Sequence, residues 1–250
     1  MIHQCYFKDS QKSSLFTEEP YKGFGLEPHL FKSLSDNCPE LESLDTRLAL
    51  TEYSSFLHIW RNKSYDTDSW IGFTSYRQLF KSKFKFQNTK EVLEILKINP
   101  VACWGRYNVT EVLQVNGKLL SGSAAQAESA HPGLYFFIER IFKVFKETIP
   151  NEFYTSPFSY FANYWVMTRE LFEDFMEWSW KYIEWSLNNK NNDEYLSSKN
   201  PVKCQENVRK LNSSGEGKAI GYFMERLFIL WYYKRVENGE IPNPLHLGDI

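Results

Sequence analysis

Hydrophobic positions along this chain fall into short blocks with two different periods. Four short apolar runs predict buried strands, at residues 2–7, 70–76, 101–104 and 164–167. Longer segments place apolar residues three and four positions apart, which predicts helices at about 45–62, 90–98, 132–145, 170–187 and 219–236. Because strands and helices alternate, we expect an α/β fold with a mostly parallel central sheet flanked by helices.

The connecting segments differ in character. Residues 9–37 are rich in Ser, Gly, Pro and Lys and predict loops, and Asn116-Gly117 predicts a hairpin turn within 109–120. The small, polar segment 121–130 predicts an exposed loop. No linker marks a second domain, so we expect one domain over 1–250. Within it we expect a loop-rich N-terminal part with the first strand over 1–44, and a mobile loop over 188–218.

Two local patterns allow more than one interpretation. Asp45 is a plausible cap for the helix at 45–62, whose Thr, Ser and His face either looks into a site or makes a polar helix contact. Residues 81–86 alternate lysines with aromatic rings. This tract could meet a diphosphate or an anionic membrane, but we favour an edge strand whose lysines discourage aggregation. Pro132 suits the first turn of the helix that follows it.

Composition excludes some functions. A net charge of -2 and a pI near 6.2 argue against a nucleic-acid partner. Aromatic residues make up 17% of the chain, which suits a dense core and also stacking against sugar rings. The four cysteines form no closely spaced pair, so we expect neither a zinc site nor a disulfide framework. Without a signal-peptide core or a membrane-length apolar run, the chain predicts a cytoplasmic protein that touches a membrane only at its surface.

The end of the strand at 70–76 is the first place that could carry chemistry. Ligands of open α/β sheets bind beyond the carboxyl ends of strands, and Ser75, Tyr76 and Arg77 follow such a strand. The Arg77 guanidinium has the planar geometry that fits phosphate oxygens. The alternative is a structural arginine paired with a carboxylate.

A second place is the pair Glu225-Arg226 inside the apolar helix at 219–236. Charges embedded there need partners, which come from the protein or from a ligand. Glu225 could bind a metal or a sugar hydroxyl, or accept a proton from an acceptor hydroxyl. An internal ion pair with Arg77 or Arg106 is an equal alternative.

Other motifs are weaker. Asp66 and Asp68 are spaced as in sites that bind Mg²⁺ or Mn²⁺, but they precede the strand at 70–76, whereas such pairs usually follow one. Gly23 and Gly25 lack the third glycine of a dinucleotide-binding loop, and no phosphate loop or serine-hydrolase elbow occurs. Taken singly, His131 predicts a structural role.

In order, these segments resemble the capsular-polysaccharide-type glycosyltransferases, a family long catalogued as a domain of unknown function. The resemblance rests on Glu-Tyr-Ser at 52–54 with Trp-Arg-Asn at 60–62, on Ile-Gly-Phe-Thr-Ser-Tyr-Arg-Gln at 71–78, on Asn-Tyr-Trp-Val-Met at 163–167 followed by Phe-Met-Glu-Trp at 175–178, and on Gly-Tyr-Phe-Met-Glu-Arg-Leu at 221–227. It extends from about residue 52 to 234. Ser75 stands where the family has histidine and Gln78 where it has a second arginine, so the chain is a divergent member.

The resemblance implies a fold similar to the GT-A type and transfer of a sugar from a nucleotide-sugar donor to a hydroxyl of a saccharide or glycolipid acceptor. It implies that Tyr76 and Arg77 handle the donor and that Glu225 serves the acceptor or a metal. Supporting roles fall to Glu52, Asn163 and Arg226, with Ser75 and His131 as additional members of the site.

Two other classes compete with this interpretation. A carbohydrate-binding or scaffold protein that keeps the fold without catalysis would explain the missing histidine and second arginine. A different nucleotide-dependent transferase, such as a sulfotransferase, is disfavoured because the chain has no phosphate loop.

Overall fold

A six-stranded sheet forms the centre of the computed structural model, which describes residues 1–27, 29–30, 33–65, 68–82, 84–160, 163–197, 218–243 and 245–248. The strand order is β10-β4-β9-β3-β1-β2. The strands are β1 (Ile2–Tyr6), β2 (Tyr21–Gly25), β3 (Trp70–Ser75), β4 (Val101–Cys103), β9 (Trp165–Thr168) and β10 (Leu245–His246). Two small ladders pair β5 (Tyr107–Asn108) with β8 (Phe158–Ser159) and β6 (Leu113–Val115) with β7 (Lys118–Leu120).

The central sheet is parallel except for one strand. β1 runs parallel to β2 and β3, and β4 runs parallel to β10. Only β9, inserted between β3 and β4, is antiparallel to both neighbours. The prediction of a mostly parallel sheet in an α/β fold is therefore confirmed, and β9 matches the strand expected at 164–167.

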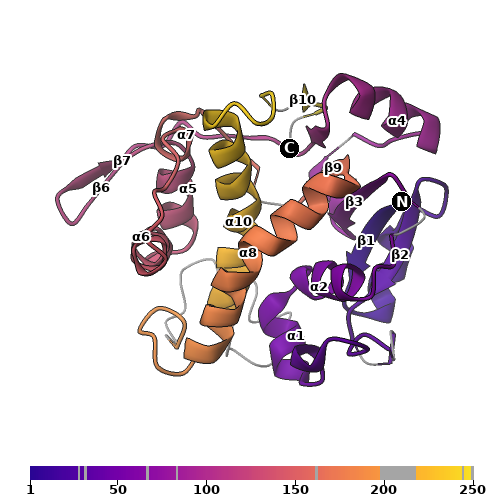
Figure 1. The fold of residues 1–250 in the computed structure, drawn as a ribbon, viewed down its shortest axis with the longest axis horizontal. Coiled ribbons are helices and arrows are strands. Elements are labelled where there is room, and N and C mark those ends of the chain that lie inside the picture. The colour runs from indigo at the N-terminus through magenta and orange to yellow at the C-terminus, as the bar shows by residue number, and fades with distance from the viewer. Residues whose placement is uncertain are drawn as a thin grey trace.

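Helices surround this sheet (Figure 1). Near the N-terminal strands lie α1 (Leu44–Leu50), α2 (Tyr53–Arg61), α3 (Gln78–Lys81) and α4 (Thr89–Ile98), with the short 3₁₀ turns η1 (Asp9–Ser14) and η2 (Pro39–Leu41). The remaining helices are α5 (Gly122–Ala130), α6 (Leu134–Val144), α7 (Glu152–Thr155), α8 (Arg169–Asn189) and α10 (Lys218–Glu237). The β6–β7 hairpin projects away from the body of the molecule, with its turn at Asn116-Gly117 as expected.

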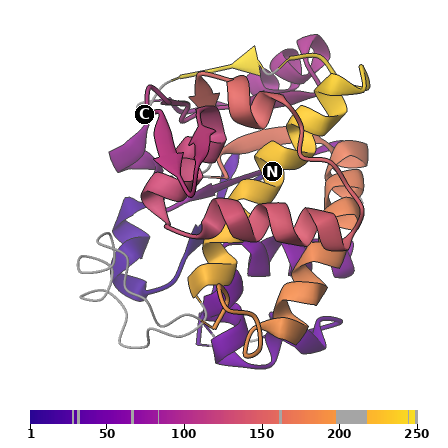
Figure 2. The ribbon, with the colours of Figure 1, turned by 90° about the vertical axis from the view of Figure 1, so that its left-hand side faces the viewer.

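The core is built around α10 and aromatic side chains. α10 packs against α1, α6, α7 and α8, and its residues 226–233 are buried on all sides. Phe228 of this helix stacks on Trp165 of β9, with ring centroids 5.4 Å apart. Phe73 of β3 lies 5.0 Å from the same tryptophan. Each fully buried ring of this kind contributes about 1.5–3 kcal/mol to folding, so most of the aromatic residues serve the core. Figure 2 shows α6 crossing in front of α10.

Several local predictions were wrong. The segment 9–37 contains η1 and the edge strand β2. The sequence Tyr-Lys-Gly-Phe-Gly did not predict a strand because two of its five residues are glycines. The segment 121–130 is the buried helix α5, because its small side chains allow close packing against α6 and α7. The described residues of the tract 81–86 form no strand: Lys81 ends α3, and Phe86 is buried against Trp104.

Two helix starts also differ from the prediction. The helix expected at 45–62 is divided at Thr51, whose φ of 52° stops α1 before α2 begins. Its cap is Ser43, and Asp45 lies in the first turn. Pro132 precedes α6, which starts at Leu134 after the cap Gly133. Most of the loop expected at 188–218 lies outside the described residues.

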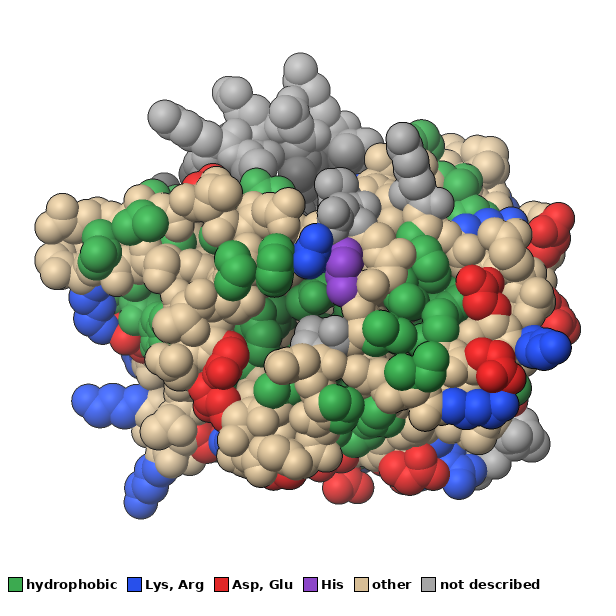
Figure 3. All heavy atoms as spheres, turned by 90° about the horizontal axis from the view of Figure 1, so that it is seen from above, with side chains coloured by type: hydrophobic (Ala, Val, Ile, Leu, Met, Phe, Trp, Pro, Cys, Tyr) green, Lys and Arg blue, Asp and Glu red, His purple; other side chains and the backbone are tan. Residues whose placement is uncertain are grey.

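The outer surface is mixed. In Figure 3, which views the side of the molecule where β10 lies, hydrophobic side chains gather in the middle of the face and charged ones toward its margins. Phe80 and Ile98 are each 76% exposed, at different ends of the sheet. None of the helices in the described ranges combines the length and hydrophobicity needed to cross a bilayer.

Candidate active site

The carboxyl-end edge of the parallel strands is where the predicted segments meet. β1, β3 and β4 end at this edge, and the antiparallel β9 begins there, since Phe73 pairs with Trp165 and Cys103 pairs with the same residue. The residues that follow β3 and those that precede β9 are therefore neighbours. This is the edge at which α/β sheets bind ligands.

Hydrogen bonds fix the backbone after β3. Ser75 Oγ accepts from the Arg77 backbone N–H at 3.2 Å and lies 2.9 Å from Tyr164 Oη. Arg77 Nε donates to Tyr76 Oη at 3.0 Å. Arg77 is exposed and, within the described residues, has no carboxylate within 4.0 Å. Ser75 therefore shapes the turn, and Tyr76 holds the Arg77 side chain by its Nε.

The division between α1 and α2 brings Glu52 to the same place. Thr51 packs against Gly221 of α10, where an added Cβ would lie 2.8 Å from Thr51 Cγ2 and 3.2 Å from the Ala49 carbonyl oxygen. Only a glycine allows this close approach of α1 to α10. Because Glu225 lies one turn after Gly221, Glu52 and Glu225 become neighbours, and the carboxylate of Glu52 helps to raise the pKa of Glu225.

The pKa of Glu225 is raised toward neutral pH. Burial is the main cause that raises its pKa, to about 6, and Glu52 acts in the same direction. Arg226, Lys81 and Arg77 oppose the shift. The side chain is still 29% exposed, so a ligand can reach it. A carboxyl with this pKa is mostly ionised at pH 7 and can still accept a proton.

The cations of the site act on the same carboxylates. Partial burial lowers the pKa of Arg77, but the hydrogen bond with Tyr76 and the charges of Glu52 and Glu225 raise it overall. Arg77 and Glu225, almost 150 positions apart in sequence, are therefore electrostatic neighbours. The charges of Arg226, Lys81 and Arg77 all act on Glu225, and Arg77 is also affected by Glu52.

Arg226 and His131 form the inner wall. Arg226 is fully buried, and its Nη1 lies 3.4 Å from Glu225 Oε2, so the two side chains are in direct contact. The ring of His131 stacks on Tyr222 with centroids 3.5 Å apart. Burial, followed by the charge of Arg226, lowers the pKa of His131 to about 3, so the imidazole is neutral. It can donate or accept a hydrogen bond but brings no charge.

Asn163 lies just before β9 and is only 4% exposed. Its φ of 54° is in the left-handed region, which asparagine tolerates better than most residues. Its Oδ1 is buried without a hydrogen-bond donor among the described residues. The next residue, Tyr164, contacts Ser75, so Asn163 is placed at the sheet edge beside the other predicted residues.

The aspartates considered for a metal lie elsewhere. Asp68 precedes β3, at the opposite edge of the sheet, where its Oδ2 is 3.5 Å from the N-terminal ammonium. Asp66 is outside the described residues. No group of three or more His, Cys, Asp or Glu side chains in the described ranges is arranged to hold a metal ion.

Two residues of this site were not among the predicted site residues: Lys81, from the tract 81–86 for which contact with a diphosphate was the less favoured interpretation, and Tyr195. Lys81 follows Arg77 by four positions, so one helical turn places both cations on the same side. Tyr195 interacts electrostatically with Arg226, Tyr222 and Glu225 although it comes from a polar segment without periodicity. The spacing of Lys81 could have revealed it, whereas nothing in the sequence pattern marks Tyr195.

The fold of this chain is one found in glycosyltransferases. A solved structure with similar architecture is the bifunctional glycosyltransferase WbbM in its apo form, with a TM-score of 0.58 and 18% sequence identity. The match covers 99% of this chain and 44% of WbbM, so the chain spans less than half the length of that protein.

No protein-family model matches the chain, and no curated protein matches it. Membership of the capsular-polysaccharide-type family therefore stays a prediction from the motifs.

Proposed function

We propose that this protein is a glycosyltransferase that moves a sugar from a nucleotide-sugar donor to a hydroxyl of a saccharide or glycolipid acceptor. The observation that carries the proposal is the convergence of Arg77, Lys81, Glu52 and Glu225 at the carboxyl edge of the sheet. The fold shared with a glycosyltransferase supports it.

The residues divide the chemistry between leaving group and acceptor. In the transfer, the bond between the anomeric carbon and the phosphate oxygen breaks, and a bond from that carbon to the acceptor oxygen forms. Arg77 and Lys81 neutralise the charge that develops on the departing diphosphate. Glu225 accepts the proton released by the acceptor hydroxyl, for which a pKa of about 6 is suited. Tyr76 holds Arg77 in place.

The charge balance bears on whether Mg²⁺ or Mn²⁺ takes part. Two carboxylates could in principle share a divalent ion, but the charges of Arg226, Lys81 and Arg77 all act on Glu225. Such an excess of positive charge fits a diphosphate better than a second cation. We therefore expect transfer to continue when a chelator removes divalent ions.

The rim of the site suggests where the acceptor resides. Leu79 and Phe80 of α3 are 50% and 76% exposed, and the cations Arg77 and Lys81 flank them. Apolar side chains bordered by cations fit an anionic membrane surface. We infer peripheral contact with a membrane that carries a glycolipid acceptor, a contact that vesicle sedimentation measures. The described cysteines, Cys5, Cys38 and Cys103, are buried free thiols, which fits a cytoplasmic location.

A screen of UDP-, GDP-, dTDP- and CMP-sugars tests the proposal. A donor at 100 times its Kd stabilises the folded protein by about 2.7 kcal/mol, which raises the melting temperature by roughly 5–10 °C. Arg77→Ala should remove this shift. Arg169→Ala is the control, because Arg169 lies where β9 ends, at the opposite edge of the sheet. If no donor binds, or if both variants respond alike, the proposal fails.

A non-catalytic saccharide-binding protein is the second candidate. It is favoured by Ser75, which stands where the family has a histidine. The Ser75 hydroxyl hydrogen-bonds with Tyr164 and with the Arg77 backbone N–H, so it serves a structural role. Donor turnover excludes this alternative.

A further inference from the structure

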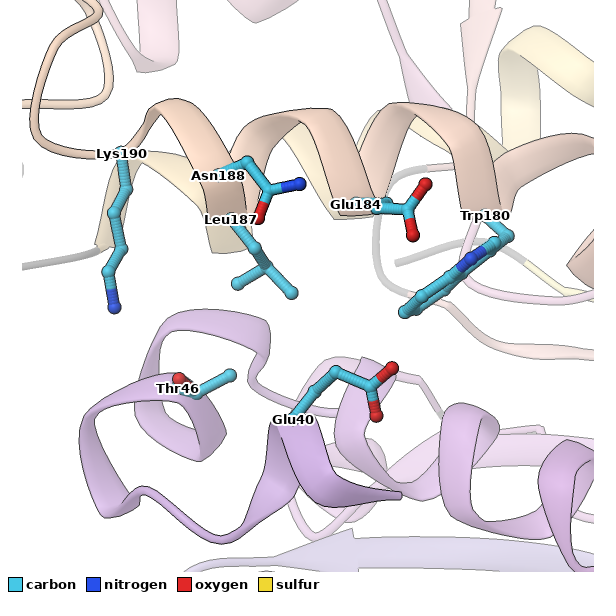
Figure 4. A pocket seen from close by; sticks show the side chains of 7 residues that line it. All are labelled: Glu40, Thr46, Trp180, Glu184, Leu187, Asn188 and Lys190. Carbon is cyan, nitrogen blue, oxygen red and sulfur yellow. The ribbon is translucent and has the colours of Figure 1, made fainter. Parts of the chain in front are cut away.

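A second pocket lies on α8, away from the candidate active site. It has a volume of about 240 Å³ and opens between the last turns of α8 and the segment that carries η2 and α1. Figure 4 shows Trp180 and Glu184 of α8 facing Glu40 across this space. We call it the α8 pocket. None of the residues assigned to donor or acceptor lines it.

The helix period builds one wall of the α8 pocket. Trp180, Glu184 and Asn188 follow one another at four-residue spacing, so they share one face of α8. Leu187 adds an apolar side chain beside them, and Lys190 lies at the end of the helix. The wall therefore offers an aromatic ring, hydrogen-bond acceptors and hydrogen-bond donors together.

Arg61 of α2 fixes the orientation of this wall. Its guanidinium lies between two indole rings, 4.8 Å from the centroid of Trp60 and 4.7 Å from that of Trp180. It also lies 3.8 Å from Glu40 Oε1. The Trp180 ring and the Glu40 carboxylate are thus held before any ligand arrives, which lowers the cost of binding.

The opposite wall carries an unused acceptor. Glu40 Oε2 is buried and has no hydrogen-bond partner among the described residues. A buried acceptor without a donor is costly, and a small rotation of the half-buried Glu40 carboxylate toward the pocket would let a ligand hydroxyl supply that donor. Thr46 lies on the same side as Glu40 and faces Leu187 (Figure 4).

Charge and size narrow the class of occupant. Two carboxylates, Glu40 and Glu184, line the pocket with one cation, Lys190, and Arg61 lies beside Glu40 without lining the pocket, so the lining does not favour an anion. Pockets that enclose a drug-sized ligand measure roughly 300–1,000 Å³. At about 240 Å³ the α8 pocket is too small for a nucleotide-sugar and fits a single ring.

We propose that the α8 pocket is a second saccharide-binding site that holds one neutral sugar ring. A pyranose presents an apolar face of C–H groups, which suits Trp180 and Leu187, and a rim of hydroxyls, which suits Glu40, Glu184 and Asn188. The identity of the occupant rests on the proposed function, in which the acceptor is a saccharide. In that setting the pocket retains a distant part of the acceptor while another part reaches Glu225.

Ligand-observed NMR with neutral probes tests this site. The probes are the methyl α- and β-glycosides of glucose, galactose, mannose and rhamnose, together with disaccharides of the same sugars. We expect at least one to bind, and Glu184→Ala to weaken its affinity about tenfold. Glu184 is exposed, so this substitution leaves folding intact. Trp180→Ala should abolish binding, with far-UV circular dichroism to verify that the helices are kept.

Matched controls separate this site from the active site. Glu177→Ala removes another exposed carboxylate of α8 that does not line the pocket, and it should leave binding unchanged. Arg77→Ala should also leave it unchanged. Binding that is lost in Arg77→Ala but kept in Glu184→Ala would overturn the proposal, as would binding of protonated amines in place of neutral sugars, or of no probe at all. If any of these results is found while the protein turns over a donor, only the α8 pocket proposal fails. If a saccharide binds the α8 pocket but no nucleotide-sugar donor binds the protein, only the proposed transferase function fails.

Discussion

The candidate active site and the α8 pocket are built in opposite ways. The active site draws on β3, the α1–α2 junction, α3 and α10, and it holds more cations than carboxylates. The α8 pocket is formed mostly by successive turns of one helix, and it is lined by two carboxylates and one cation. The first arrangement suits a charged diphosphate, whereas the second suits a neutral ring.

If both proposals hold, this one small fold separates recognition of the saccharide from its transfer. A site assembled from distant segments can bring groups with opposing charges together and shift the pKa of Glu225, as burial does here. A site on one helix face cannot bring distant charged groups together, because the 3.6-residue period of the helix fixes which residues share that face. It can hold a ligand but has fewer means to activate one.

Replacing Glu225 should give the largest effect. Glu225→Gln keeps the shape and an acceptor for Arg226 but cannot take up a proton, so transfer should fall by roughly 10²–10⁴-fold. Because the pKa of Glu225 is raised to about 6, the active ionised form is lost as pH falls. In the wild type, kcat/KM should decrease about tenfold per pH unit below pH 6. A flat profile between pH 5 and 7, or an active glutamine variant, would assign the proton to another group. Saccharide binding at the α8 pocket should be unchanged.

A smaller effect is expected from Gly221, which sets the distance between α1 and α10. In Gly221→Ala the new methyl group meets Thr51 Cγ2 at 2.8 Å, and Thr51 is branched and stiff. We expect a loss of about 1–3 kcal/mol in the free energy of unfolding, measured by urea denaturation. Adding Thr51→Ser removes the clashing methyl group and should restore much of the stability. Equal stability of Gly221→Ala and wild type would contradict the close packing of these helices.

The smallest expected effect concerns membrane binding, and it compares the two edges of the sheet. Phe80→Ser should weaken sedimentation with anionic phospholipid vesicles about fivefold, the equivalent of about 1 kcal/mol from partial burial of one ring. Ile98→Ser is the matched control, because Ile98 is equally exposed but precedes β4 at the other edge of the sheet. If the two variants bind vesicles equally, the rim of the active site does not face the membrane.

Much of the fold could be predicted because periodicity reports burial. β3 and β9 are continuous apolar runs, and α4, α6 and α8 show clear helical spacing. α5 was not predicted, because its sequence Gly-Ser-Ala-Ala-Gln-Ala-Glu-Ser-Ala has no apolar stripe. It is buried because its side chains are small. The break at Thr51 was not predicted either, since the contact with Gly221 that favours it lies 170 positions away.

The site could be predicted only in part, for a related reason. Arg77 and Glu225 each stand in an apolar run where a charge is conspicuous, so the sequence marks them. Their roles stay predictions, although the structure places them together. The contribution of Tyr195 depends on how a polar segment folds back onto α10, and the contribution of Trp180 depends on Arg61 from another helix. The spacing of neighbouring residues in the sequence predicts neither of these contacts.

The reversed direction of β9 has a consequence for redesign. In a wholly parallel sheet, only residues that leave a strand would border the reaction centre, but here the approach to β9 borders it too. Substitutions at Asn163 would therefore remodel that border while Trp165, Val166 and Met167 keep their places in the ladder. Under the proposed function, this is the position at which substitutions would change the preferred sugar without disturbing the scaffold.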